Sequence, residues 1–459
     1  MEFSRVSGMT LAVTVALAVI GCSQKEEPKP QAAAPAPAAQ PEVTVKLGHV
    51  APLTGPQSHL GKDNENAARM AVDELNSQNL EIGGAKVKFE LLAEDDQADP
   101  KQGTIVAQKL VDAKVNGVVG HLNSGTTIPA SKIYFDAGIP QISGSATNPK
   151  YTQQGFTTAF RVMSNDIQQG TVLGNYAVQQ LAGKTVAIID DRSAYGQGLA
   201  DEFEKAVIAA GGKIAGREFT NDKATDFSAI LTKIKAKKPD VVFYGGMDAQ
   251  GGPMVKQMKA LGLKKTKFLT GDGGCTPELI KLAGEAAEGQ YCSLPGVPLD
   301  QMPGGKAFGD KFTAKYGQIQ LYAPYVYDAV MVMADAMKRA NSVDSAKFLP
   351  EIGKTNYQGV SSKISFDEKG DLKNGAISLY QVKAGKWEYL ETMGGAPVEA
   401  NGTPIGAAKD AVQEAAKATA EAAKATGSAA KDVAKEGVKA GAEAVKGAAD
   451  ATKAAVEKK

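Results

Sequence analysis

The chain has 459 residues, more than one compact hydrophobic core usually holds, so two domains are expected. Its formal net charge of +1 gives no reason to expect nucleic acid or an acidic partner. Three histidines and three cysteines leave little material for metal binding or acid–base chemistry, which argues against an enzyme, and no cofactor is expected. His49 is expected directly after a strand and His59 and His121 in loops, and each is interpreted as incidental.

Residues 1–21 are predicted to be a signal peptide rather than part of the fold. Arg5 precedes an apolar run over 9–20 that is too short to cross a bilayer comfortably. The run leads into VIGC, which ends at Cys22 and resembles the lipobox of bacterial lipoproteins; the resemblance implies that this cysteine is lipid-modified and becomes the first residue after cleavage. The alternative is ordinary cleavage after the sequence ALA at 16–18, which leaves a soluble periplasmic protein with a free thiol.

Residues 22–41 form a proline- and alanine-rich stretch that cannot bury a core, so we interpret it as a semi-rigid tether. A tether directly after Cys22 favours the lipoprotein hypothesis, because several acyl chains on one residue give durable anchoring. By resemblance to the sorting rules of Gram-negative bacteria, Ser23 does not retain the protein in the inner membrane. We therefore expect a lipid-anchored periplasmic protein, with sorting to the outer membrane as an open alternative.

Between residue 42 and about residue 396, short β-branched runs alternate with helical stretches. In the first half we expect strands within 43–55, 87–96 and 115–120, and helices over 61–76 and 99–114. The pattern restarts at Lys184, with strands expected within 185–198, 213–219, 241–246 and 268–274 and helices up to 210, over 226–240 and over 251–263. This order predicts an α/β fold of two Rossmann-like lobes, each with a doubly wound, mostly parallel sheet. If the carboxyl ends of both sets of strands face each other, a cleft forms between the lobes.

The segment Gly120–Pro149 is expected to bring polar groups to one sheet edge. It contains the end of a buried strand, a hydroxyl-rich turn at 123–127, a helix over 130–136, a second strand, and another small loop at 144–147. Hydroxyls, backbone amides and a helix N-terminus at two adjacent strand ends suit an anion. Because no Walker loop and no GxGxxG motif is present, we expect a carboxylate rather than a nucleotide. The alternative is ordinary helix capping.

Eight motifs occur in order along the globular part: LTGPQSHLGK, DDQADPKQ, GVVGHLNSGTTIPAS, DRSAYGQGLA, DFSAIL, DVVFYGG, AGEAAEG and FDEKGDLKNG. Together they make residues 42 to about 382 resemble the periplasmic leucine/isoleucine/valine-binding proteins, the type I periplasmic binding fold of solute receptors for ABC importers. The resemblance implies lobe 1 at 42–161 and 294–368, lobe 2 at 162–293 and 369–396, and a hinge of three crossings near 161–163, 292–295 and 364–372.

The resemblance and the chemistry of a free amino acid together assign ligand-binding residues. The ligand carboxylate is expected to bind Ser124 and Thr147, with backbone donors from the segment Ser145-Ala146-Thr147. The ammonium is expected to bind Asp272, because a charge-assisted bond in a partly dry site is strong, and Tyr195 is expected to close over the ligand. The alternative is that these residues are plain helix caps, a turn carboxylate and a helix-start aromatic.

The pocket for the ligand side chain is assigned to Leu60, Met247 and Tyr322, at positions where relatives often carry aromatic residues. The replacements at Leu60 and Met247 could enlarge or reshape this pocket. Asp248 is interpreted as a solvent-facing carboxylate, with contact to a polar or basic ligand group as the alternative.

The cysteines differ from those of relatives, which can have a disulfide that braces the first lobe. Ala98 and Asn123 occupy those positions here, so that bridge is absent. Cys275 and Cys292 instead flank a helix of the second lobe and are predicted to pair, because the compartment is oxidising. The alternative is two separately buried thiols.

Residues 397–459 form an Ala/Lys/Glu-rich tail, interpreted as a marginal amphipathic helix or a disordered segment that is solvated or touches the cell wall, a membrane surface or another copy. The main hypothesis is a monomeric, high-affinity solute-binding component of an ABC importer, which delivers branched-chain or other apolar amino acids to a permease in the inner membrane. Two alternatives are a receptor or sensor of another small solute on the same fold, and a structural envelope protein that acts through its tail.

Overall fold

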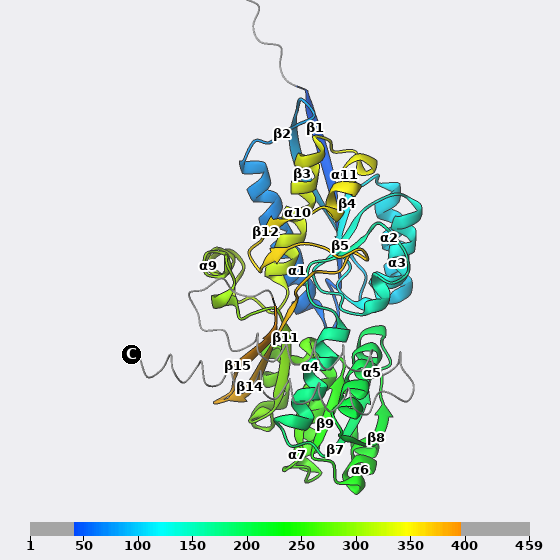
Figure 1. Cartoon of the computed structure of the whole chain (residues 1–459), viewed down its shortest axis with the longest axis vertical. Coiled ribbons are helices and arrows are strands. Elements are labelled where there is room, and N and C mark those ends of the chain that lie inside the picture. Colours follow the sequence, from blue (N-terminus) through cyan, green and yellow to red (C-terminus); the bar gives the residue numbers. More distant parts are fainter. Residues whose placement is uncertain (1–40, 396–459) are drawn as a thin grey trace, which may run out of the picture. The chain divides into compact units, whose positions relative to one another are not determined.

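The computed structural model describes residues 41–395, which Figure 1 colours along the chain. The predicted signal peptide, the predicted lipidation site Cys22, the tether up to residue 40 and the tail from residue 396 lie outside the described residues. Among the described helices, none combines the length and the apolar composition needed to cross a bilayer.

The first sheet has six strands in the order β2-β3-β1-β4-β5-β6, and every neighbouring pair is parallel except β2–β3. Helices cover both faces, so the alternating side chains of β1 are buried on both: Val45 and Leu47 pack in the cluster that contains residues of α1, and Val50 packs with residues of α2 and α3. The elements are β1 (Glu42–Ala51), α1 (Ser58–Ser77), β2 (Glu81–Ile82), β3 (Ala85–Asp95), α2 (Pro100–Asp112), β4 (Gly117–Gly120), α3 (Ser124–Asp136), β5 (Gln141–Ser143), the 3-10 turn η1 (Pro149–Tyr151) and β6 (Ala159–Arg161).

The second sheet has seven strands in the order β15-β14-β11-β10-β9-β7-β8, with β14 and β15 antiparallel at one edge. Alternate residues of β7 again face opposite layers, since Ile188 packs in the cluster that contains residues of α4 and α5 and Ile189 packs with residues of α6 and α7. The elements are α4 (Asp166–Gln179), β7 (Thr185–Asp190), α5 (Ala194–Ala209), β8 (Lys213–Phe219), α6 (Ser228–Lys237), β9 (Val241–Gly245), α7 (Asp248–Ala260), β10 (Lys267–Thr270), η2 (Asp272–Gly274), α8 (Pro277–Ala283), η3 (Gly284–Ala287), β11 (Tyr291–Pro295), β14 (Ala376–Lys383) and β15 (Lys386–Gly394).

A third group of elements lies between β11 and β14 in the sequence but packs against the first sheet. Its central helix α10 (Ala323–Ala340) contacts α1, β4 and β5 and is buried along most of its length. In Figure 1, α10 and α11 lie among the elements of the first sheet. The chain therefore passes between the sheets after β6, after β11 and before β14. The other members are η4 (Leu299–Gln301), α9 (Gly305–Tyr316), α11 (Ser345–Gly353), β12 (Tyr357–Gln358) and β13 (Lys363–Ile364).

Both sheets repeat one topology in their parallel strands. In chain order within each lobe, the strands run 2-1-3-4-5, as β3-β1-β4-β5-β6 and as β8-β7-β9-β10-β11. Successive connections leave the first strand in opposite directions, so loops diverge where β1 meets β4 and where β7 meets β9. Open α/β sheets bind ligands at the carboxyl ends of such strand pairs. The predicted fold class is confirmed.

Helix α3 begins at Ser124 rather than at the predicted residue 130. The backbone amides of Thr126 and Thr127 both donate to the carbonyl of Asn123, at 3.1 and 2.9 Å, so the hydroxyl-rich turn is the first turn of the helix. The hydroxyl-rich composition of 123–127 suggested a turn, and Gly125 and Pro129 also weaken helices, yet packing of this helix against α2 outweighs these local preferences.

Two histidine positions were also predicted wrongly. His49 lies within β1, because the pairing of β1 with β3 and β4 continues beyond it. His59 lies in the first turn of α1, which starts after a turn in which the amide of Ser58 donates to the carbonyl of Gly55 at 3.1 Å. His121 follows β4, as predicted.

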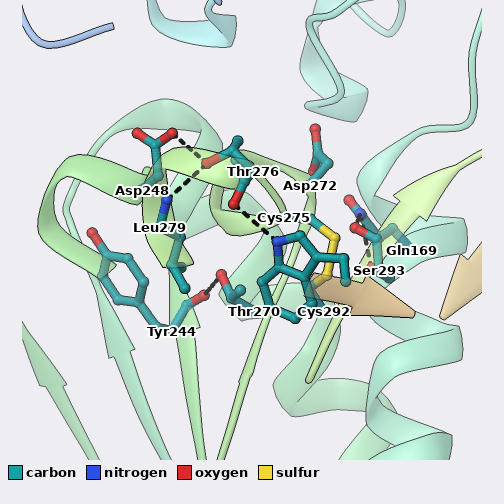
Figure 2. Close-up of a disulfide and its surroundings, with 12 residues drawn as sticks. Gln169, Tyr244, Asp248, Thr270, Asp272, Cys275, Thr276, Leu279, Cys292 and Ser293 are labelled. Carbon is teal, nitrogen blue, oxygen red and sulfur yellow. Dashed lines mark hydrogen bonds between the residues drawn. A yellow bond between two sulfur atoms is a disulfide. The ribbon is translucent and has the colours of Figure 1, made fainter. Parts of the chain in front are cut away.

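The predicted disulfide between Cys275 and Cys292 is present. Figure 2 shows it at the end of β10, where η2 leads into α8 and the neighbouring strand β11 carries Cys292. Both half-cystines are buried, and the indole of Trp387 donates to the carbonyl of Thr276 at 2.9 Å nearby. The bridge therefore ties the loop after β10, which carries Asp272, to the adjacent strand.

We expect removal of this bridge by Cys275→Ser/Cys292→Ser to lower the free energy of unfolding by about 3 kcal/mol, because a bridge that closes a loop of 17 residues restricts the unfolded chain. Urea unfolding of the two proteins measures the difference. In a Cys22→Ser background, unfolded and unreduced protein should contain no titratable thiol; two thiols per chain would contradict the pairing.

Candidate ligand site

The residues predicted to bind ligand lie in loops or first helical turns, most of them after the carboxyl ends of strands of the two sheets, and all are buried. Six strand ends contribute, together with the start of α10. Leu60 lies after β1, Ser124 after β4, Ser145, Ala146 and Thr147 after β5, Tyr195 after β7, Met247 after β9, Asp272 after β10, and Tyr322 directly before α10. Leu60 and Ser124 follow β1 and β4, the two strands of the first sheet whose loops diverge. Tyr195 and Met247 follow β7 and β9, the corresponding strands of the second sheet.

Asp272 is held by tyrosine hydroxyls from both lobes. Tyr195 donates to Oδ1 at 2.8 Å, and Tyr322 donates to Oδ2 at 2.6 Å. Because Tyr322 directly precedes α10, which packs on the first sheet, its bond crosses the cleft. Burial raises the pKa of Asp272, and the two tyrosine bonds lower it without cancelling that effect. The carboxyl group is fixed in position in a nearly dry site.

Gly273 permits the close approach that this arrangement needs. A Cβ at this position would lie 2.8 Å from Sδ of Met247 and 2.8 Å from Cε1 of Tyr195. The amide of Gly273 donates to the Tyr195 hydroxyl at 2.9 Å, so the same oxygen accepts one bond and donates another. A larger residue would push Tyr195 away from Asp272.

The first lobe contributes hydroxyls and a helix N-terminus. Oγ of Ser143 accepts from the amides of Ser145 and Ala146, at 3.3 and 2.9 Å, and so shapes the loop after β5. Oγ of Ser124, at the start of α3, accepts from the amide of Asn148 at 3.2 Å. Oγ1 of Thr147 is buried and has no hydrogen-bond partner among the described residues. These groups bring hydroxyls and a helix N-terminus from the first lobe to the same set of strand ends.

Asp166 is a buried acidic residue that the sequence analysis missed. It is the first residue of α4, and its amide donates to the carbonyl of Thr147 at 2.9 Å. Neither carboxyl oxygen has a hydrogen-bond partner within residues 41–395. Burial and the charge of Asp272 raise the pKa of Asp166 well above its ordinary value, and the nearby hydroxyl of Thr147 lowers the pKa without cancelling that effect. In the sequence, Asp166 is an acidic residue at the start of a helix, directly after a predicted crossing between the lobes. The same pattern is typical of an ordinary helix start capped by Asn165, so it did not indicate a buried site.

Asp248 does not face solvent, contrary to the sequence-based interpretation. Its side chain is fully buried, accepting from Thr276 Oγ1 at 2.6 Å and lying 2.8 Å from Nε2 of His59. Figure 2 shows the Thr276 bond beside the disulfide. Asp248 contacts His59, which belongs to α1 of the other lobe and lies 189 positions away in the sequence.

Arg161 connects the passages between the two sheets to the loop after β5. This fully buried guanidinium donates from Nε to Asp371 Oδ1 at 2.9 Å, on the segment that leads to β14. Its Nη1 donates to the carbonyls of Ala146 and Asn148, both at 2.9 Å. Asp371 also accepts from Asn165, which caps α4. One cation therefore joins two of the three passages between the sheets to the loop after β5.

Two α/β lobes whose strand ends meet at these buried residues define a two-lobed architecture of the type I periplasmic binding fold. Among residues 41–395 there is no group of His, Cys, Asp or Glu that could hold a metal ion. The sequence matches the periplasmic binding protein family over residues 44–386, and the chain belongs to this family. Members of this family are periplasmic binding proteins.

Three similar proteins illustrate the match. The Leu/Ile/Val-binding protein homolog 1 of Brucella abortus is 38% identical over 356 residues, which cover 76% of this chain and 93% of the relative. A leucine-, isoleucine-, valine-, threonine-, and alanine-binding protein of Pseudomonas aeruginosa is 34% identical, with 74% and 90% covered. The structure of a branched-chain amino acid transporter substrate binding protein from Streptococcus pneumoniae, in complex with isoleucine, aligns with a TM-score of 0.70 at 29% identity and covers 77% of this chain and all of that chain.

We expect Asp371→Asn to lower the free energy of unfolding by roughly 3 kcal/mol, because it leaves the guanidinium of Arg161 buried without its charge partner. Urea unfolding measures the loss. Asp310→Asn is the matched control, since it removes a carboxylate from an exposed pair with Lys306 and should leave the midpoint unchanged. Equal midpoints for Asp371→Asn and the parent protein would show that the hinge does not depend on this pair.

Proposed function

We propose that this protein is the solute-binding component of an ABC importer for amino acids, with branched-chain or other apolar amino acids as ligands. The observation that carries the proposal is the buried carboxyl of Asp272, which two tyrosine hydroxyls fix in position, together with the buried hydroxyls of Ser124 and Thr147 from the first lobe. A zwitterion matches this arrangement, because its two charges need opposite partners. The relatives named for leucine, isoleucine and valine support the same ligand class.

The ligand ammonium would lie against Asp272 and Asp166. Asp272 already accepts two hydroxyl bonds, whereas both carboxyl oxygens of Asp166 lack a partner in the described part of the chain. A buried, unpaired carboxylate is costly, and a cation within hydrogen-bonding distance would offset that cost. Neutral solutes leave this cost in place, which favours amino acids over amides or urea.

The ligand carboxylate would bind the hydroxyls and the helix N-terminus of the first lobe. Ser124 and the first turn of α3 offer a hydroxyl and helix amides. The buried hydroxyl of Thr147 lies beside Asp166, between the proposed carboxylate and ammonium positions. The segment Ser145-Ala146 would contribute shape rather than free amides, because Ser143 already accepts from both. Helix N-termini stabilise anions through unpaired amides and the helix dipole.

The ligand side chain would occupy the space between Leu60, Met247 and Tyr322. Leu60 and Met247 supply apolar surface from opposite lobes, and the thioether of Met247 adapts to different shapes. The hydroxyl of Tyr322 is engaged with Asp272, so its ring is held at one edge of this space. An apolar lining favours aliphatic ligands.

Ligand contacts from both lobes would make binding and closure one event. The lobes touch through Tyr322 and Asp272, and through Asn148, whose side-chain amide donates to the carbonyl of Ala194 at 2.6 Å. Only the closed arrangement offers a ligand all its contacts, so the ligand shifts the population of lobes toward it.

The remaining assignments follow from this function. We propose a monomer that is lipid-anchored through Cys22 in the periplasm of a Gram-negative bacterium and delivers its ligand to an inner-membrane permease. As lobe boundaries we propose 42–161 with 294–368, and 162–293 with 369–396, between the tether and the tail.

Purified protein should gain thermal stability with leucine, isoleucine or valine among the twenty amino acids, since a ligand of the folded state raises its melting temperature by mass action. Asp272→Asn should weaken leucine binding by roughly 10- to 100-fold in calorimetry, because it removes a charge-assisted bond to the ammonium.

Two controls belong to this experiment. Asp310→Asn alters an exposed carboxylate and should bind like the parent protein. 2-Hydroxy-4-methylpentanoate, which lacks the ammonium, should bind far more weakly than leucine. Unchanged leucine affinity in Asp272→Asn would refute the ammonium assignment, and a screen without any stabilising amino acid would favour another solute.

Cys22→Ser should move the protein from the membrane fraction to the soluble periplasmic fraction and abolish incorporation of radiolabelled fatty acid, because the acyl chains supply the membrane affinity. Ser23→Ala keeps the thiol and should remain membrane-bound. Retention of Cys22→Ser in the membrane fraction would contradict lipid anchoring at this residue.

A further inference from the structure

A polar contact joins the two lobes beside the apolar end of the cleft. Nε2 of His59 lies 2.8 Å from Oδ2 of Asp248. His59 belongs to α1, which packs on the first sheet, and Asp248 begins α7, which follows β9 of the second sheet. Their chain neighbours Leu60 and Met247 are the two residues proposed to line the side-chain pocket. The contact therefore crosses the cleft next to that pocket without belonging to it.

The second lobe holds Asp248 in place independently of His59. Thr276 Oγ1 donates to Oδ2 at 2.6 Å and accepts from the amide of Leu279, which ties the carboxylate to the start of α8. Asp248 is also the first residue of α7, where the helix dipole favours a negative charge. The carboxylate thus stays in position when the lobes separate, and separation replaces His59 by water.

The charge of His59 decides how strong the contact is. The side chain of Asp248 is fully buried and that of His59 is 23% exposed, so the pair is largely shielded from water. A neutral imidazole can donate one ordinary hydrogen bond to the carboxylate, whereas an imidazolium adds opposite charge, which makes the bond stronger. His59 and Thr276 both contact Oδ2 of Asp248, and Oδ1 has no hydrogen-bond partner within the described residues, so no second cation shares the carboxylate with His59.

Burial lowers the pKa of His59, but the hydrogen bond and the charge of Asp248 outweigh it, so the pKa lies above its ordinary value of 6.5. Glu278 of α8 acts in the same direction from the facing lobe. On its own helix, Lys62 pairs with Glu65 at 3.6 Å, and Asp63 accepts from the backbone amides of Gln320 and Leu321.

We infer that His59 and Asp248 form a latch across the cleft, which stabilises the closed lobes when His59 is protonated and thereby makes ligand affinity depend on pH. The inference rests on the proposed function, since it describes how the same cleft closes. The sign follows from linkage. The closed state binds the proton more tightly than the open state, so the latch is fully formed below the ordinary pKa of histidine and is lost as pH rises through the raised value.

The other histidines do not share this property. His121 lies 3.1 Å from Asp96 and 3.0 Å from the hydroxyl of Tyr134, and both partners belong to the first lobe. His49 is fully buried in β1 and its Nδ1 contacts the carbonyl of Val119 at 2.9 Å. Closure leaves these contacts unchanged, so His59 is the histidine in residues 41–395 whose protonation is coupled to lobe closure.

Leucine affinity measured by calorimetry between pH 5.5 and 8.5 tests the latch, because leucine itself keeps both charges across this range. We expect the parent protein to lose roughly three- to tenfold in affinity as pH rises. His59→Gln should no longer show this loss of affinity with rising pH, and Asp248→Asn should do the same. Ionisation of Asp166 and Asp272, whose pKa values burial raises, is common to all three proteins and cancels in the comparison. In buffers of different ionisation enthalpy, the parent should take up protons on binding near neutral pH, whereas His59→Gln should not.

Small-angle scattering of the ligand-free protein provides a second readout. The radius of gyration should be smaller at pH 5.5 than at pH 8.5 in the parent protein and independent of pH in His59→Gln. Leucine binding without any pH dependence, equal in parent and His59→Gln, would overturn the latch and leave the proposed function intact. Failure to bind leucine would count against the proposed function, and the scattering comparison would still decide the latch: equal radii at both pH values would overturn it.

Discussion

The arrangement of the two lobes depends on the hydrogen bonds and the ion pair of the buried Arg161 guanidinium. A buried cation is tolerated only with full compensation. Here Asp371 supplies the charge, and the carbonyls of Ala146 and Asn148 and the hydroxyl of Thr152 supply the remaining acceptors. Those partners lie on the third crossing and on the loop after β5. The bonds that hold these crossings together therefore also fix the position of the loop after β5, which carries Thr147.

Charge is distributed unevenly across the cleft. The second lobe and its entry contribute the buried carboxyl groups of Asp166, Asp248 and Asp272, and the first lobe contributes hydroxyls, helix amides and His59. Burial makes each ionised carboxyl costly, so each gains from a partner on the facing lobe or on a ligand. Tyr322 provides that partner for Asp272 and His59 provides it for Asp248, whereas Asp166 has only the hydroxyl of Thr147 nearby and no cation. Contacts from the facing lobe and contacts from a ligand would therefore both reduce the cost of burying these carboxyl groups.

The order of elements was predictable because hydrophobic periodicity and turn residues are local signals. Strand β8 occupies residues 213–219, as expected from the run KIAGREF. Helix α2 starts directly after Asp99, within one residue of the expected start, and the side chain of Asp99 accepts from the amides of Lys101 and Gln102. Prediction failed where packing overruled local preference, as at the start of α3. It also failed for Asp248 and Asp166, since a carboxylate at a helix start reads the same whether it faces water or another lobe.

By itself, the sequence determined two α/β lobes, the strand ends that carry the polar loops, and the pairing of Cys275 with Cys292, because periodicity, loop composition and the number of cysteines are properties of the chain. Only the tertiary structure decided which groups meet across the cleft. Tyr322 reaches Asp272 and His59 reaches Asp248 from positions 50 and 189 residues apart, and such contacts depend on how the lobes close. Burial then turns these meetings into shifted pKa values and unpaired oxygens, which no local pattern encodes.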